Sequence, residues 1–146
     1  MKVVIARRNQ FLNIACLVSS ILALDAGFNW TVPDMPWMKY PVIIVGMIGI
    51  AFMIFFLIST PSKVIERLDD KLILREPPRK KNEIVIKIAD IVAVDFMPNP
   101  QKPSDKIKNS IEIKVIADGI EQIYYCTSIL KPKKVLEKLK ALIGKE

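Results

Sequence analysis

Residues 42–58, VIIVGMIGIAFMIFFLI, decide the fold, because this run has no charged and no strongly polar side chain. A helix over 41–59 is about 28 Å long at ~1.5 Å per residue, which suits the hydrocarbon core of a bilayer. A buried helix in a soluble core is the alternative. It would need the rest of this short chain to surround an entirely apolar helix. We therefore predict a transmembrane helix at about 41–59.

A second apolar run, FLNIACLVSSILALDAGF, covers residues 11–28 and is diluted by polar side chains, with Asp25 near its far end. A cleaved signal peptide is the rival interpretation, but Leu24 and Ala26 form a poor cleavage pair. A lipoprotein interpretation of Cys16 leaves too few apolar residues ahead of it. The two runs predict a hairpin of two transmembrane helices, at about 11–28 and 41–59.

Small residues mark a face on each predicted span. Ala15, Ser19 and Ala23 recur every four positions in the first, and Gly46 and Gly49 lie in the second. Small side chains let membrane helices approach closely, so these five residues are predicted to form the hairpin contact. A homo-oligomer contact through the same faces is equally allowed.

Basic residues lie just before the first predicted span and just after the second. They are Lys2, Arg7, Arg8, Lys63 and Arg67. The loop between the spans holds a single basic residue, Lys39, together with Trp30, Trp37 and Tyr40, which suit an aromatic belt. The positive-inside rule then places both termini in the cytoplasm of a multi-pass protein of the cell's inner or plasma membrane.

Beyond Pro61 the pattern changes to the alternation of apolar and polar residues typical of half-buried strands. The expected strands cover residues 64–75, 83–88, 91–96, 111–115 and 120–127. Asp69-Asp70 is a possible local turn, Asp118-Gly119 suits a type I′ hairpin, and the proline-containing stretch 97–109 is expected to be a loop.

The chain ends in KPKKVLEKLKALIGK, in which Pro132 suits the first turn of a helix. Its apolar stripe consists of Val135, Leu136, Leu139, Leu142 and Ile143. The predicted fold class is therefore a membrane α-hairpin within residues 1–60, followed by an α+β cytoplasmic domain at 61–146 in which this helix covers an antiparallel sheet.

Three segments carry a resemblance to a known family: KLILREPPRKKNEIVIKIADIVAVDF at 71–96, IEIKVIADGIEQIYY at 111–125, and the P-x-x-V-x-x-x-L-x-x-L-I pattern from Pro132. They resemble the bacterial pleckstrin-homology-like (PH-like) domain. The whole chain resembles small bacterial membrane proteins that carry this domain behind a two-helix hairpin. The resemblance implies a partial barrel capped by the C-terminal helix, with enough strands for seven only if MKVVIA at 1–6 adds an edge strand.

One basic cluster, Arg75, Arg79, Lys80 and Lys81, lies between two expected strands. In PH domains that bind phosphoinositides the corresponding loop holds the phosphate ligands, so the resemblance implies a headgroup site there. Two other interpretations stay open. The loop is either a solvated turn or a cationic surface that contacts anionic lipid without a pocket.

Composition argues against an enzyme. The chain has 22 Lys+Arg against 15 Asp+Glu, a net charge of +7, no His, two Cys and five Gly. The usual general base, the Cys/His zinc site and the glycine-rich phosphate loop are therefore missing, and no metal or cofactor is expected. The lysines near the C-terminus have no aromatic residues among them, which argues against nucleic-acid binding.

These observations predict a non-catalytic interaction module that binds an unidentified protein or the anionic inner leaflet. Its expected contact surfaces are the sheet edge and the 97–109 loop. An immunity protein against a membrane-active bacteriocin and an accessory subunit of a membrane complex are the alternative functions, and a homo-oligomer is possible.

Overall fold

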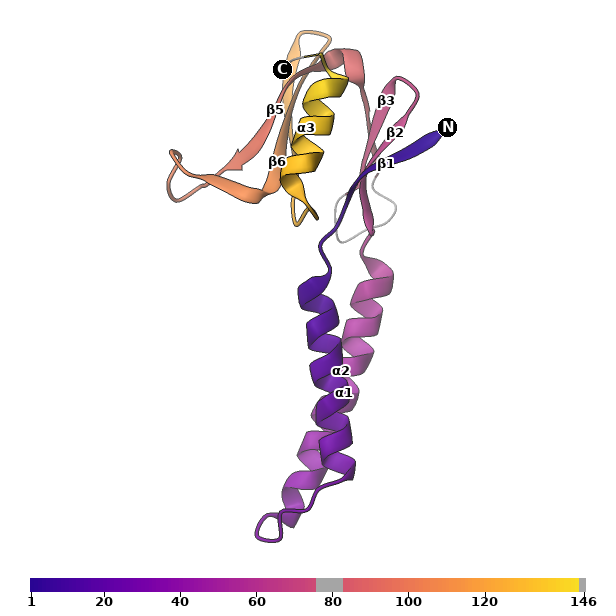
Figure 1. The fold of residues 1–146 in the computed structure, drawn as a ribbon, viewed down its shortest axis with the longest axis vertical. Coiled ribbons are helices and arrows are strands. Elements are labelled where there is room, and N and C mark those ends of the chain that lie inside the picture. The colour runs from indigo at the N-terminus through magenta and orange to yellow at the C-terminus, as the bar shows by residue number, and fades with distance from the viewer. Residues whose placement is uncertain (76–82, 145–146) are drawn as a thin grey trace. The chain divides into compact units, whose positions relative to one another are not determined.

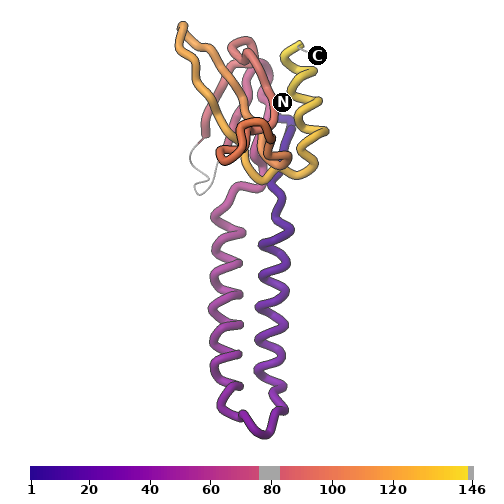
Figure 2. The backbone as a smooth tube through the Cα atoms, turned by 90° about the vertical axis from the view of Figure 1, so that its left-hand side faces the viewer, coloured from indigo at the N-terminus to yellow at the C-terminus, as the bar shows by residue number. Residues whose placement is uncertain are grey.

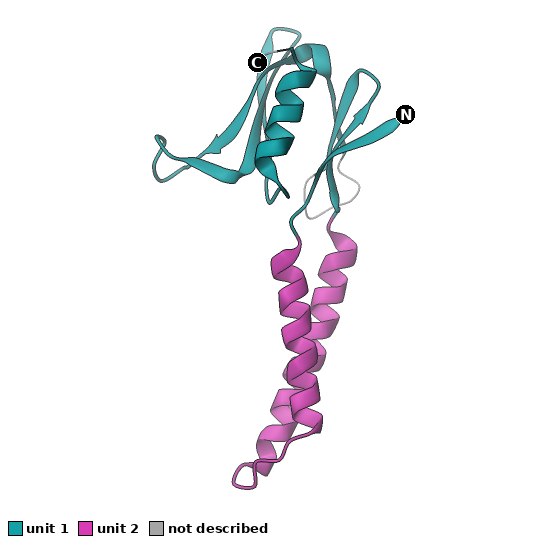
Figure 3. Ribbon diagram, viewed as in Figure 1, with its two compact units in different colours: residues 1–9, 61–146 teal, residues 10–60 magenta. Residues whose placement is uncertain are grey.

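The computed structural model describes residues 1–75 and 83–144, and the chain divides into two compact units (Figure 3). Residues 10–60 form one unit, and residues 1–9 together with 61–146 form the other. The sequence prediction placed residues 1–9 with the hairpin. They belong to the other unit because they form a strand of its sheet.

The unit of residues 10–60 consists of helices α1 (Phe11–Phe28) and α2 (Lys39–Ser59), joined by a loop with a short 3-10 helix η1 (Pro36–Met38) (Figure 2). α2 begins slightly before the predicted span, since Pro41 is tolerated in a first helical turn. The spans have mean hydropathies of 1.8 and 2.9, and only 6% of each is buried. Such helices are not the core of a globular unit; their length and composition suit a membrane crossing.

Glycines bring α1 and α2 together. Gly46 is buried, and a methyl group added to it would lie 2.9 Å from the backbone nitrogen of Leu24. A methyl group on Gly49 would collide with Ser20, and one on Gly27 of α1 would lie 2.6 Å from the side chain of Ile43. The helix backbones therefore approach more closely than larger side chains would permit.

The contact face of α1 differs from the predicted stripe at one residue. Ser19 is exposed, and its hydroxyl donates to the Ala15 carbonyl of its own helix at 2.9 Å, whereas Ser20 faces Gly49. Ala15 and Ala23 are half-buried. An α-helix has 3.6 residues per turn, so residues spaced strictly by four lie progressively further around the helix. The residues that contact a partner helix are therefore spaced alternately by three and by four.

The other unit contains two antiparallel sheets (Figure 1). The first has the order β1 (Lys2–Arg7), β2 (Lys63–Leu68), β3 (Lys71–Arg75) and β4 (Glu83–Lys87). A short 3-10 helix η2 (Ile88–Asp90) leads to the second, which has the order β5 (Ile91–Pro98), β6 (Lys106–Ala117) and β7 (Ile120–Cys126). The edge strand that the sequence allowed for at residues 1–6 is present as β1.

Strand β1 joins the sheet across a long gap in sequence. It pairs antiparallel with β2, with Arg7 opposite Lys63, and the Arg8 N–H donates to the Ser62 carbonyl at 2.8 Å. The chain thus leaves the sheet after β1, forms both helices and returns in the neighbouring strand. The helical hairpin is an insertion between two paired strands.

Local turn chemistry agrees with the sequence prediction, whereas the loop at 97–109 is shorter than predicted. Asp118 and Gly119 both have positive φ, 53° and 77°, as a type I′ turn requires, so this prediction is confirmed. β5 extends to Pro98, which pairs with Lys106 at the start of β6, leaving the loop at residues 99–105. Proline at a strand end costs no essential ladder hydrogen bond.

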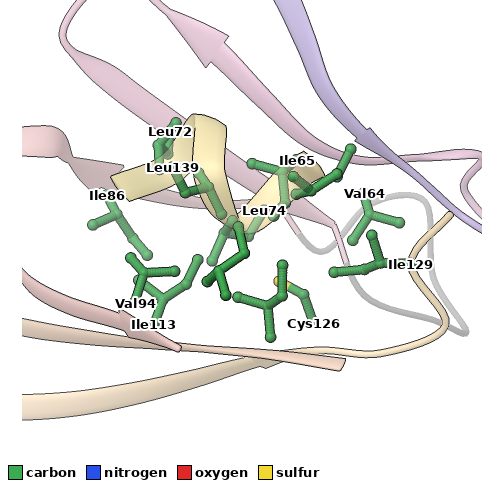
Figure 4. Close-up of a cluster of buried hydrophobic side chains, with 14 of the residues drawn as sticks. Val64, Ile65, Leu72, Leu74, Ile86, Val94, Ile113, Cys126, Ile129 and Leu139 are labelled. Carbon is green, nitrogen blue, oxygen red and sulfur yellow. The ribbon is translucent and has the colours of Figure 1, made fainter. Parts of the chain in front are cut away.

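Helix α3 (Pro132–Leu142) supplies one wall of the core (Figure 4). Val135, Leu136 and Leu139 are buried, as the predicted stripe requires, and Leu142 and Ile143 pack partly buried beside them. The helix contacts β1, β5 and β6. It therefore covers both sheets, and their inward-facing side chains meet beneath it.

Candidate functional site

Arg75, at the end of β3, pairs with carboxylates on both neighbouring strands. Glu83 lies directly opposite it on β4 and accepts a hydrogen bond from Nε at 2.9 Å, and Nη2 lies 2.8 Å from the same carboxylate oxygen in an ion pair. On the other side, Nη1 donates to Glu66 of β2. The planar guanidinium group thereby links three adjacent strands, which a single ammonium group would do less well.

The ion pair between Arg75 and Glu66 is largely buried. The side chain of Glu66 is 5% exposed and that of Arg75 is 13% exposed. The hydrogen bond from Arg75 holds the pKa of Glu66 below its ordinary value, although burial acts in the opposite direction. Burial also opposes the charge on Arg75, but its hydrogen bonds to Glu66 and Glu83 raise its pKa above the ordinary value. Both groups are charged at neutral pH.

Two lysines, Lys2 and Lys63, lie near Glu66. The Nζ of Lys63 lies 3.8 Å from Glu66 Oε1, and the charge of Lys2 also lowers the pKa of this carboxyl. A cavity of about 390 Å³ opens here, lined by Lys2, Pro61, Ser62, Lys63, Glu66 and Arg75. Its lining holds three cations and one carboxylate, so the charge of the cavity favours an anionic group.

The predicted basic cluster is only partly described. Arg79, Lys80 and Lys81 lie outside the described residues, and Arg75 uses its guanidinium group in the two ion pairs. Arg75 therefore acts first as a link within the sheet. Any anion bound beside it is held mainly by Lys2 and Lys63.

Sequence reasoning missed Lys63 and Glu66 as members of this site. The only signal for Glu66 was a charge opposite to that of Arg75, on the strand that neighbours Arg75 once the chain turns at Asp69-Asp70. That turn was predicted as possible, but the register of the hairpin was not. Because a shift of one residue moves every side chain to the other face, the charge pattern alone did not pair Glu66 with Arg75.

The cavity beside Arg75 lies at one end of the first sheet. Arg7 pairs with Lys63, Ile65 with Leu74, and Arg75 with Glu83. The same end of the sheet therefore holds Arg7, Lys63, Arg75 and Glu83.

Within residues 1–75 and 83–144, no group of three or more His, Cys, Asp and Glu side chains is placed to hold a metal ion. The cavity beside Arg75 presents mainly cationic side chains, which attract negative charge.

Comparisons of the chain with protein-family models, with curated proteins and with solved structures find no significant match.

Proposed function

We propose that the chain is a non-catalytic, membrane-anchored interaction module. The helical hairpin anchors it in the cell membrane as two transmembrane helices, and the sheet unit is a PH-like domain in the cytoplasm. The end of the first sheet that carries Lys63 and Arg75 contacts the anionic inner leaflet. The observation that carries the proposal is the insertion of the hairpin between the paired strands β1 and β2.

This insertion constrains how the chain crosses the membrane. Arg8 and Ser62 are hydrogen-bonded neighbours in one compact unit, so both ends of residues 10–60 start on the same side. An even number of crossings is then required, and two helices of spanning length supply it. A signal peptide fits poorly, because cleavage after α1 would also remove β1.

Charge around the hairpin supports the cytoplasmic placement. Arg7, Arg8 and Lys63 lie where the chain joins α1 and α2, whereas Lys39 is the single basic residue near the far loop. Positively charged residues next to membrane spans are retained on the cytoplasmic side.

The PH-like assignment is supported by strand order and by the helix. Antiparallel sheets of four and three strands, followed by a C-terminal helix that covers them, match the architecture that the sequence resemblance implied. In this arrangement the membrane hairpin replaces the connection between the first two strands.

Leaflet contact follows from charge held close to the membrane. Each Lys or Arg near an anionic surface contributes about 1 kcal/mol without a specific pocket. Lys2 and Lys63 line the cavity, and Arg79, Lys80 and Lys81 follow Arg75 within a few residues in the sequence. Because the anchor is covalent, this contact needs little affinity of its own.

Cysteine labelling in intact cells tests the topology. In a Cys16→Ser, Cys126→Ser background, Asp34→Cys should react with a membrane-impermeant thiol reagent and Lys106→Cys should not. Labelling of Lys106→Cys would reverse the orientation and end the cytoplasmic interpretation.

A fluorescent probe tests the leaflet contact. An environment-sensitive fluorophore on Ser62→Cys, in the full chain reconstituted in nanodiscs, should shift its emission when neutral lipid is replaced by a mixture rich in anionic lipid, and salt should reverse the shift. The same fluorophore on Asp70→Cys, in the turn at the other end of the sheet, is the matched control. Equal behaviour of the two probes would contradict the proposal.

A further inference from the structure

A groove runs between β1 and α3, and Arg67 of β2 also lines part of it. Figure 2 shows the indigo strand beside the yellow helix, which contacts it. Two cavities of about 390 Å³ and 340 Å³ lie here, and Val4, Ile5 and Lys138 line both. They therefore form one continuous groove, which shares no lining residue with the cavity beside Arg75. We call it the β1–α3 groove.

The groove has an apolar floor. Its apolar lining residues are Val3, Val4 and Ile5 from β1, Leu130 from the loop before α3, and Val135, Ala141 and Leu142 from α3. Val3 is 49% exposed, although it lies in a strand next to a hydrophobic core. Apolar side chains left open between an edge strand and a helix are typical of peptide-binding grooves.

The other lining residues are all cationic. They are Arg7, Arg67, Lys131, Lys134 and Lys138, and no Asp or Glu lines either cavity. This contrasts with the cavity beside Arg75, where Glu66 balances part of the charge. A ligand of the β1–α3 groove must therefore bring both apolar groups and negative charge.

The backbone of β1 adds a third feature. β1 is an edge of the four-stranded sheet, so within the described residues no strand lies on the outer side of Val3 and Ile5. Further along, the Arg7 carbonyl accepts a hydrogen bond from the Leu130 N–H at 2.8 Å, which closes the edge at that end. The open stretch of edge contains Val3, Val4 and Ile5, which line the groove. Unpaired edge groups are a template for one more strand.

We propose that the β1–α3 groove binds an extended, acidic segment of a partner protein, which adds to β1 as a strand. Alternate side chains of this segment enter the apolar floor, and its carboxylates meet the lysines of α3. The proposal rests on the proposed role as an interaction module and names the partner's chemistry. A second copy of β1 suits the groove poorly, because antiparallel pairing would place Lys2 opposite Arg7.

Selection from a random library tests the partner chemistry. The full chain, in nanodiscs of neutral lipid, is panned against phage that display random ten-residue peptides. The expected result is enrichment of sequences in which Asp or Glu alternates with apolar residues. Failure to enrich any sequence, or enrichment of sequences without acidic residues, would overturn the proposal.

Charge reversal locates the binding surface. For a selected peptide, Lys134→Glu with Lys138→Glu should raise the dissociation constant by about tenfold or more at low salt. Lys133→Glu is the matched control, because this exposed residue of α3 lines neither cavity of the groove. Val3→Glu provides a second variant, on the strand side. Equal affinity for all these variants and the parent chain would overturn the proposed site.

Backbone methylation separates strand addition from charge attraction. Two versions of the peptide are made, N-methylated at its odd or at its even positions. In a strand only alternate N–H groups face the neighbour, so one version should lose binding and the other should keep it. Retention by both versions would indicate charge attraction alone, and loss in both would indicate a non-extended peptide. Either outcome rejects strand addition.

The same nanodiscs distinguish this proposal from the proposed leaflet contact. With anionic lipid, the Ser62→Cys probe reports on the leaflet, and the charge reversals in the groove should leave its shift unchanged. A chain that binds acidic peptides without a probe shift retains the groove and loses the leaflet contact. A chain that shows the probe shift without peptide binding retains the leaflet contact and loses the groove.

Discussion

The hairpin and the sheet unit distribute their apolar side chains in opposite ways. In α1 and α2 most large apolar residues point outward, Gly27 and Gly46 are the residues buried within the helices, and the helices meet through glycine. In the sheet unit Ile, Leu and Val fill a closed core, and lysines dominate the exposed face of α3. Packing through small residues is typical of helices in lipid, and burial of large apolar residues is typical of domains in water, so the two units differ as the proposed membrane anchor requires.

Polar groups differ between the units as well. Ser19 and Ser20 donate to carbonyls of their own helix, at Ala15 and Cys16, both at 2.9 Å. In the sheet unit Arg75 reaches Glu66 on another strand. A helix satisfies its polar groups locally, as a membrane requires, whereas a sheet brings together charges that lie apart in sequence. Substitutions in the sheet unit should therefore cost more than those in the hairpin.

The largest effect is expected from Arg75→Met, because it leaves the buried carboxylate of Glu66 without its partner. The free energy of unfolding should fall by about 3–5 kcal/mol. Exposure of the buried Cys126 thiol to a labelling reagent, in a Cys16→Ser background, measures this loss. The double variant Glu66→Met, Arg75→Met should recover most of it. If Arg75→Met and the double variant lose the same free energy of unfolding, the unpaired charge of Glu66 is not the cause of the loss.

A second large effect concerns the core. Leu139 of α3 is 1% exposed where the helix packs on the sheets, so Leu139→Ala should lower the free energy of unfolding by about 2–5 kcal/mol. Lys138→Ala, at the exposed neighbouring residue, should change it little. Thiol labelling of Cys126 measures both variants. Similar values for the two would mean that α3 does not hold the sheets together.

A smaller effect is expected at the hairpin contact. Gly46→Ala places a methyl group 2.9 Å from the backbone nitrogen of Leu24, so the helices must separate, at a cost of about 1–3 kcal/mol. Loss of helical circular dichroism on heating in detergent measures it. Ile48→Ala, at an exposed position of the same helix, serves as the control. A greater loss at Ile48 than at Gly46 would place the contact on another face.

The mildest test uses pH. Glu66 has a folded pKa below its ordinary value of 4.5, so its contribution to stability is complete above about pH 4.5 and is lost as the pH falls through the lower folded pKa. Thiol labelling of Cys126 at decreasing pH should show this loss, and Glu66→Gln should flatten that part of the profile. An unchanged profile would assign the acid sensitivity to other carboxyls, such as Asp95, whose pKa the hydrogen bond from Lys106 also lowers.

Features with a local cause were predictable. The helix at 11–28, the turn at Asp118-Gly119 and the buried stripe through Leu139 follow from apolar runs, turn chemistry and helical periodicity within a few neighbouring residues. The candidate site was predictable only in part. Its basic character was visible around Arg75, but the carboxylates that hold this residue were not.

By itself the sequence determined two apolar helices, strands of alternating pattern and an amphipathic terminal helix, because short-range periodicity specifies them. The tertiary structure alone decided that β1 pairs with β2 across the entire hairpin, that Ser20 rather than Ser19 faces Gly49, and that Glu66 neutralises Arg75. Each of these depends on register or helix rotation between distant segments. A shift of one residue in either would leave the local pattern intact and change every contact.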